Sequence, residues 1–189
     1  MKNVRNYYTL VLILLALVVC TDAQELDGNS ERAAAAIDFR TRVEMYAKQR
    51  AAIESKFPPL DKQSSAVMIV AHKNRLLKSI TAVRRDAKRG SIFTPKAERL
   101  IRSIIAEHYS DSNRAKLRKE LLEAENASVP VEVNGVYPES AEMLEMPPAL
   151  LLVLPGLPKA VRYRLVGTNL LLVDSENNLI IDYMTDALL

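Results

Sequence analysis

The sequence predicts a mainly α-helical fold of the α+β class that ends in a small antiparallel sheet. Apolar side chains recur every three or four positions between residues 31 and 125, which is the period of an amphipathic helix. Prolines interrupt residues 127–160 and exclude long helices there. Residues 163–184 alternate short apolar runs with turn residues, which is typical of a β-meander.

The first helix is expected to begin at Asn29 or Ser30, because either side chain can cap a helical turn. Two prolines at positions 58 and 59 should end it. Arg50 fills a gap in its apolar stripe, where its stem can lie on apolar neighbours while its guanidinium stays in water. The stripe itself has heptad-like spacing and consists of Phe39, Val43, Tyr46, Ile53 and Phe57.

A second helix is expected over residues 64–89, with Gly90 in the position after its end. The short proline-containing turn before it predicts an antiparallel hairpin with the first helix. The apolar positions expected to face inward are Ile69, Leu76, Ile80, Val83 and Ala87.

Two shorter helices should follow the hairpin. Thr94 is a good N-cap and Pro95 suits the first helical position, so the third helix should begin there. The fourth is expected over residues 114–125. The inward positions of the two helices are Leu100, Ile101, Ile104, Ile105, Leu117, Leu121 and Leu122.

Residues 127–160 are expected to form an acidic, proline-containing strap across the helices, with one short helix over residues 148–154. Three strands should follow over residues 163–166, 170–173 and 179–184, joined by turns at "GTN" and "SENN".

Side chains of the last strand should alternate between the two faces of the sheet. We expect one face to carry Leu179, Ile181 and Tyr183, and the other to carry Ile180, Asp182 and Met184. The meander should pack on the apolar "MPPALLLVLPGLP" segment and on the helices. One of its edges is then left for a partner strand. Asp174 is interpreted as a side chain that stabilises the following turn.

The N-terminal segment predicts export by a Sec-type signal peptide. Lys2 and Arg5 precede an unbroken apolar run at residues 10–20, and a small-x-small site follows. Cleavage is expected between Ala23 and Gln24. Two alternatives stay open: an uncleaved membrane anchor, for which the run is short, and lipidation of Cys20, although Val19 is not the small residue that this signal prefers.

These features divide the chain into four parts. They are a signal peptide (residues 1–23), a helical domain (24–126), the strap (127–160) and the C-terminal meander (161–189). Cys20 is the only cysteine, so the mature chain would have neither a disulfide nor thiol chemistry.

Charge is divided along the chain. Residues 31–120 carry 21 Lys or Arg and 10 Asp or Glu, whereas residues 121–189 carry 3 and 10. One interpretation is that the acidic strap neutralises the basic helices. Another is that a basic face binds an anionic lipid or polysaccharide. That face would consist of Lys73, Lys78, Arg84, Arg85, Lys88 and Arg89. No nucleic-acid motif occurs.

No constellation for catalysis, cofactor binding or metal binding is recognisable. The two histidines, His72 and His108, fall on different predicted helices, and no serine lies in a nucleophile elbow. Glu139, Glu142 and Glu145 could form an acidic turn, but such charge runs usually stay in water. We therefore predict a non-enzyme without a cofactor.

The motifs resemble a set of uncharacterised exported bacterial proteins. The matching pieces cover most of the mature chain and are Phe39, Arg42, Val43, Tyr46 and residues 90–95, 133–138, 146–158 and 163–183. The meander alone resembles the C-terminal module of periplasmic nickel/cobalt-homeostasis proteins. The resemblance implies an exported helical protein with a small β module, and it transfers neither catalytic residues nor metal ligands.

The function expected from the sequence is binding or assembly by a non-catalytic protein of the periplasm or cell envelope. Its partner could be a second copy or an envelope protein paired at the sheet edge, with no transmembrane span left after signal removal. The alternatives are a hydrolase of an envelope polymer that uses Glu142 or His108, and an accessory protein in metal stress.

Overall fold

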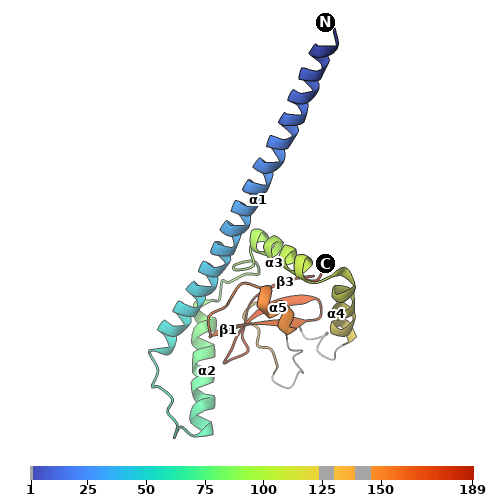
Figure 1. The fold of residues 1–189 in the computed structure, drawn as a ribbon. Coiled ribbons are helices and arrows are strands. Elements are labelled where there is room, and N and C mark those ends of the chain that lie inside the picture. Colours follow the sequence, from blue (N-terminus) through green and yellow to red (C-terminus); the bar gives the residue numbers. More distant parts are fainter. Residues whose placement is uncertain (1, 124–129, 139–145) are drawn as a thin grey trace.

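The computed structural model describes residues 2–123, 130–138 and 146–189, with side chains described from residue 28 onward. Within these residues it has the expected α+β architecture of helices followed by one antiparallel sheet (Figure 1). The helices are α1 (Lys2–Glu54), α2 (Ala66–Val83), α3 (Pro95–His108), α4 (Asp111–Glu123) and α5 (Pro148–Val153). The strands are β1 (Val161–Val166), β2 (Asn169–Asp174) and β3 (Ile180–Met184).

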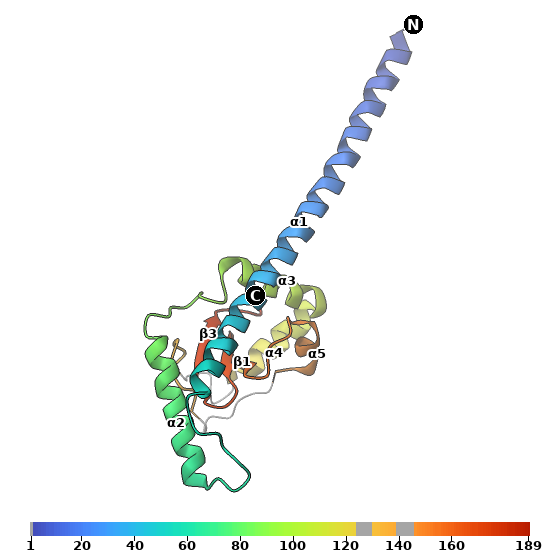
Figure 2. The ribbon, with the colours of Figure 1, turned by 90° about the vertical axis from the view of Figure 1, so that its left-hand side faces the viewer.

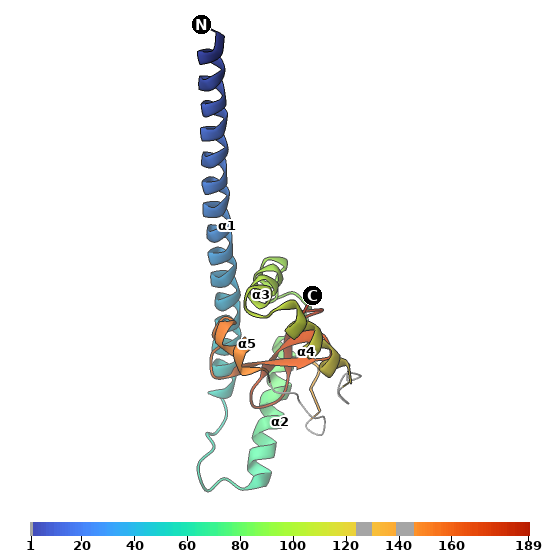
Figure 3. The ribbon, with the colours of Figure 1, turned by 45° about the vertical axis from the view of Figure 1, so that its right-hand side comes forward.

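The helix α1 is continuous from Lys2 to Glu54, and its N-terminal half projects away from the rest of the molecule (Figures 1 and 3). The expected start at Asn29 or Ser30 is therefore wrong. Four alanines follow at 33–36, and alanine has the highest helix propensity, so the helix continues through the capping residue types at 29 and 30 even though Gly28 precedes them. Its C-terminal half and α2 form the expected antiparallel hairpin (Figure 2).

One hydrophobic core joins the hairpin, the shorter helices and the sheet. Phe39, Val43 and Tyr46 of α1 are buried in it together with Leu170 and Leu172 of β2. The stripe expected on the first helix is thus confirmed, although Phe57 at its end is only half-buried. The helical hairpin therefore shares its core with the last strands of the chain.

Thr94 and Pro95 begin α3 as expected, since the Thr94 hydroxyl accepts a hydrogen bond from the Ala97 backbone N–H at 3.3 Å. The buried face of α2 differs from the prediction. It consists of His72, Leu76 and Ile80, while Val83 at the helix end is 56% exposed. The difference arises because α2 is shorter than the expected helix over residues 64–89. It spans Ala66–Val83, so Val83 is its last residue.

The inward positions of the two shorter helices are mostly confirmed. Leu100, Ile101, Ile105 and Leu121 are buried. The exception is Leu122, which is exposed on α4.

The sheet has the order β1-β2-β3 and is covered on both faces. One face belongs to the main core, which also contains Met146, Leu150 and Leu154 of the strap, as expected. The other face, with Leu171 and Val173, packs on Tyr137. The strap thus supplies apolar cover to both sides of the meander.

The strap also covers one edge of the sheet. The Ile180 backbone donates to Gly135 and accepts from Asn134, at 2.8 and 2.9 Å, and Tyr137 N–H donates to Asn178 at 3.0 Å. The edge of β3 is therefore partly satisfied. At the other edge, no strand pairs with the outer side of β1 among the described residues.

A β-bulge in β3 changes the expected alternation of side chains. Leu172 pairs with Asp182 and Val173 pairs with Ile180, so Ile181 is an extra residue between two paired ones. Directly opposed residues share a face, which places Asp182 with Leu172 on the helical side. Tyr183 packs instead with the opposite cluster. The expected grouping of Leu179, Ile181 and Tyr183 on one face is therefore wrong.

The bulge directs the Asp182 carboxylate at the connection between α2 and α3. This side chain is fully buried and accepts hydrogen bonds from the backbone N–H groups of Gly90, Ile92 and Phe93, at 2.9, 2.6 and 2.9 Å. Gly90 has a φ of +84°, which favours glycine at this close approach. A single carboxylate thus fixes the sheet to the start of α3.

Replacing Asp182 with alanine should lower the free energy of unfolding by at least about 3 kcal/mol, because each orphaned buried donor costs about 1–3 kcal/mol. Urea unfolding of the full chain measures the change. The matched control is Asp86→Ala, at an exposed aspartate, which should change stability by less than about 0.5 kcal/mol. Equal midpoints for the two variants would contradict this role of Asp182.

Candidate functional site

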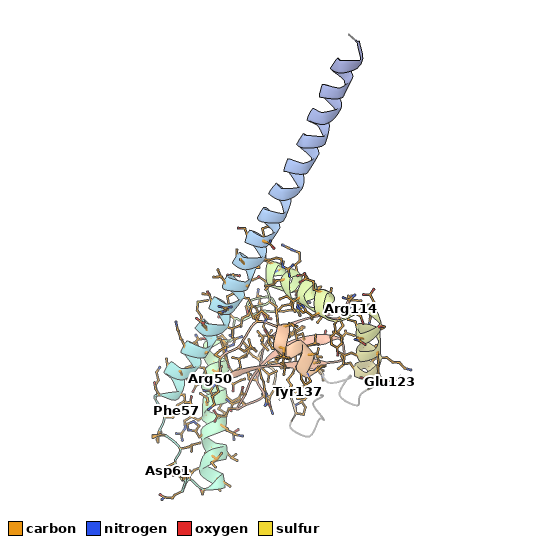
Figure 4. The ribbon with its side chains drawn as sticks, viewed as in Figure 1. Arg50, Phe57, Asp61, Arg114, Glu123 and Tyr137 are labelled. Carbon is orange, nitrogen blue, oxygen red and sulfur yellow. The ribbon has the colours of Figure 1, made fainter. Side chains whose placement is uncertain are left out.

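Five ionisable side chains from three parts of the chain converge where α1 passes the sheet, near the position of Arg50 in Figure 4. We call this set the Arg50 cluster. It consists of Arg50 and Glu54 of α1, His72 of α2, Asp174 at the end of β2, and Glu176 in the turn that follows.

Asp174 is fully buried and has two tasks. Its Oδ1 accepts from the backbone N–H groups of Glu176 and Asn177, at 3.0 and 3.2 Å, which is the turn-stabilising role that the sequence predicts. Its Oδ2 accepts from the Tyr46 hydroxyl and from Arg50 Nε, both at 2.8 Å. Asp174 therefore also connects the meander to α1.

Arg50 is 8% exposed, so its guanidinium is buried rather than in water as expected. Besides Asp174 it contacts Glu54 Oε2 at 2.6 Å and Glu176 Oε2. Burial acts to lower the pKa of Arg50, but the neighbouring carboxylates of Asp174, Glu54 and Glu176 outweigh it and raise the pKa above its ordinary value. The guanidinium consequently stays charged.

Tyr46 and Arg84 extend this network away from the cluster. Burial, together with the Asp174 carboxylate, raises the pKa of Tyr46 far above its usual value, so the hydroxyl remains a donor. The Arg84 guanidinium lies 5.1 Å from the centre of the Tyr46 ring and donates to the Ile181 carbonyl at 2.7 Å. Burial lowers the pKa of Arg84 from its ordinary value.

Two open clefts, of about 610 and 640 Å³, meet at the cluster, and Glu54 and Glu176 line both. The first also contains His72, Phe57 and Leu60. The second contains Arg50 with Lys73 and Lys159. The outer oxygens of the cluster are thus accessible to a small ligand, whereas Asp174 is sealed beneath them.

Two cations of the expected basic face have internal partners. Arg84 holds Tyr46 and β3 as described, and it lies just beyond the end of α2. Arg89 lies 5.3 Å from the centre of the Tyr183 ring, donates to Thr185 Oγ1 at 3.0 Å and pairs with Glu98 at 3.5 Å. Both therefore fasten the helical part to the last strand.

The remaining four cations of that face lie further out. Arg85 pairs with its neighbour Asp86 at 3.5 Å, and both are exposed. Lys78 and Lys88 are exposed, and Lys73 is half-buried beside the second cleft. These four positions are the part of the expected face that a ligand could reach.

His108 is exposed at the end of α3 and its Nδ1–H donates to the Ile104 carbonyl at 2.9 Å. Glu139, Glu142 and Glu145 lie outside the described residues. The side chains of Cys20, Ala23 and Gln24 in the predicted signal segment also lie outside them. Within residues 28–123, 130–138 and 146–189, no helix is both long and apolar enough to cross a membrane.

Comparison with protein-family models, curated proteins and solved structures finds no match to this chain. Its site must therefore be interpreted from its own geometry.

Sequence reasoning missed the Arg50 cluster because Arg50 and its buried partner Asp174 are 124 residues apart in the sequence. One signal was present: Arg50 occupies a position where the helical stripe requires an apolar side chain. A charged side chain at such a position indicates a buried ion pair as readily as a charged group that reaches water. His72 offered a weaker signal of the same kind, since it lies four residues before Leu76 and eight before Ile80 on the buried face of α2.

Replacing Arg50 with methionine should lower the free energy of unfolding by about 3–5 kcal/mol, because the buried Asp174 carboxylate then loses its charged partner. Thermal and urea unfolding of the full chain measure the effect. Arg40→Met, at an exposed position of the same helix, is the matched control and should change stability by less than about 0.5 kcal/mol. If both variants unfold alike, the ion pair does not hold the sheet to α1.

Proposed function

We propose that this chain is an exported, non-catalytic protein that acts by binding, and that the free end of its helical hairpin contacts an anionic membrane surface. The observation that carries this proposal is a group of exposed apolar side chains at that end. They are Leu60, Val67, Met68, Ile69 and Val70, which we call the hairpin tip.

The hairpin tip projects beyond the body of the molecule, at the end opposite the N-terminus (Figure 1). Val67 is 78% exposed, and Met68 and Val70 are each 55% exposed. Ser65 caps this end of α2 by accepting from Met68 N–H, so the helix is formed there although its apolar side chains are exposed. Contiguous exposed apolar surface of this kind marks contact sites.

The arrangement of the tip favours a lipid interface over a protein partner. Residues 67–70 are consecutive, and successive helical side chains point about 100° apart. These four side chains therefore surround the helix. A partner helix would instead require a single apolar stripe along one side. An acyl-chain boundary can accept apolar groups in every direction.

Charge around the tip specifies an anionic surface. Residues 55–78 contain five Lys or Arg and one Asp. Lys56 and Lys62 are exposed in the loop next to the tip. Basic residues close to an anionic bilayer contribute about 1 kcal/mol each to binding.

Export is supported by the N-terminal sequence, in which a basic start, an apolar run and the small residues before Gln24 follow one another. Expression of the full chain in a bacterial host followed by intact-mass spectrometry tests this part. We expect a mature chain that begins at Gln24 in the exported fraction. An unprocessed chain in the membrane fraction would contradict cleavage, and a lipid mass on Cys20 would indicate anchoring instead.

Membrane contact is tested by co-sedimentation with vesicles of phosphatidylcholine alone or mixed with phosphatidylglycerol. The protein should bind the anionic vesicles, and Val67→Asp with Val70→Asp should abolish binding because charged groups cannot enter the acyl boundary. Reversal of Lys56 and Lys62 to Glu should weaken binding by at least roughly tenfold, at about 1 kcal/mol per lost charge.

The matched control for the tip is Leu152→Asp, at a leucine of α5 that is 86% exposed. It should bind like the unmodified chain. Equal binding to both kinds of vesicle, or equal loss in the Leu152 variant, would contradict a specific role of the tip. Light scattering at low and high salt distinguishes self-association, for which the outer edge of β1 is the available surface.

A further inference from the structure

The imidazole of His72 is buried but lacks a hydrogen-bond partner among the described residues. It is 7% exposed, and its Nε2 lies 3.7 Å from Glu54 Oε1, which is beyond hydrogen-bonding distance. Buried polar side chains normally have a partner. His72 lines the first of the two clefts together with Glu54 and Glu176 of the same cluster.

The three side chains can supply one ligand atom each to a common centre. The ligand atoms of Glu54, His72 and Glu176 all lie within 4.8 Å of one another. In a tetrahedral zinc site with bonds near 2.0–2.1 Å, neighbouring ligand atoms are roughly 3.3 Å apart. The Glu54 and Glu176 side chains are 37% and 26% exposed, so rotation about their side-chain bonds can close the difference.

Arg50 leaves part of each glutamate free. Its guanidinium contacts the Oε2 atoms of Glu54 and Glu176, so the Oε1 atom of each carboxylate is available. The cluster contains three carboxylates and one guanidinium and therefore has a formal charge of −2. A divalent cation would neutralise it, and two further cations, Lys73 and Lys159, line the second cleft.

An aromatic ring also contacts the imidazole. The Phe57 ring meets it edge to face, with centres 6.0 Å apart and planes at 85°. The Arg75 guanidinium lies 5.6 Å from the centre of the Phe57 ring and covers it. Packing against Phe57 thus restricts the orientation of the His72 ring, whose Nε2 lies 3.7 Å from Glu54 Oε1.

We propose that Glu54, His72 and Glu176 form a binding site for a divalent first-row transition-metal ion such as Zn²⁺, with water completing the coordination. One imidazole and two carboxylates are ligands that such ions accept, and hard cations that prefer only oxygen are disfavoured. The bound ion would join α1, α2 and the turn after β2. Leu60 of the hairpin tip lines the same cleft, but the three ligands lie outside the tip, so either proposal can fail without the other.

Titration calorimetry of the full chain with ZnCl₂ alone, in chelator-free buffer, tests the site. We expect binding of one ion per chain and a rise in the thermal midpoint with added Zn²⁺. His72→Ala should weaken binding by at least about tenfold, as should Glu176→Gln in the partly exposed turn. His108→Ala is the matched control, because it removes the chain's other histidine at an exposed position.

Absence of heat and of a thermal shift in the unmodified chain would overturn the proposal. So would an equal loss of affinity in His108→Ala and His72→Ala. Circular dichroism checks that each variant is folded. If His72→Ala does not fold, Glu176→Gln decides the question alone, because it changes a ligand atom without removing side-chain volume. Unchanged Zn²⁺ affinity in a folded Glu176→Gln variant would then overturn the site.

Discussion

The buried ion pair between Arg50 and Asp174 is the interaction on which the rest of the structure depends. It joins α1 to the end of β2, two segments that have no local reason to meet. A buried charge is tolerated only with a partner, so neither side chain can be lost alone. The same pair sets the surroundings of Tyr46, which donates to Asp174, and of Glu54 and Glu176, which flank the guanidinium.

Asp182 of β3 has a comparable role. Two side chains of α1 connect Asp174 to the helices, whereas backbone N–H groups between α2 and α3 connect Asp182 to them. Together the two aspartates fix the sheet against the helices at two points. Both aspartates are buried and fully engaged in these contacts. The groups that a ligand can reach are the outer oxygens of Glu54 and Glu176 and the His72 ring.

Local signals in the sequence predicted much of the fold. Thr94 and Pro95 predict the start of α3 correctly. Gly167 and Asn178 both have a positive φ, which their residue types favour in turns. The wrong predictions concern features that depend on contacts between residues far apart in the sequence. The bulge at Ile181 depends on pairing with β2, and the fate of Arg50 depends on a residue 124 positions away. No spacing rule reports such contacts, so the cluster was not predictable as a site.

The distances along the chain between these partners affect how the protein is made. Partners of Arg50 and of Ile92 lie in the last sixteen residues of a 189-residue chain, at Asp174 and Asp182. Contacts between such distant segments form late, because a long loop must close first. During synthesis the hairpin therefore lacks the sheet's contribution to its core until the C-terminal residues have been made. Under the proposed export, this delay keeps the chain unfolded enough to cross a membrane.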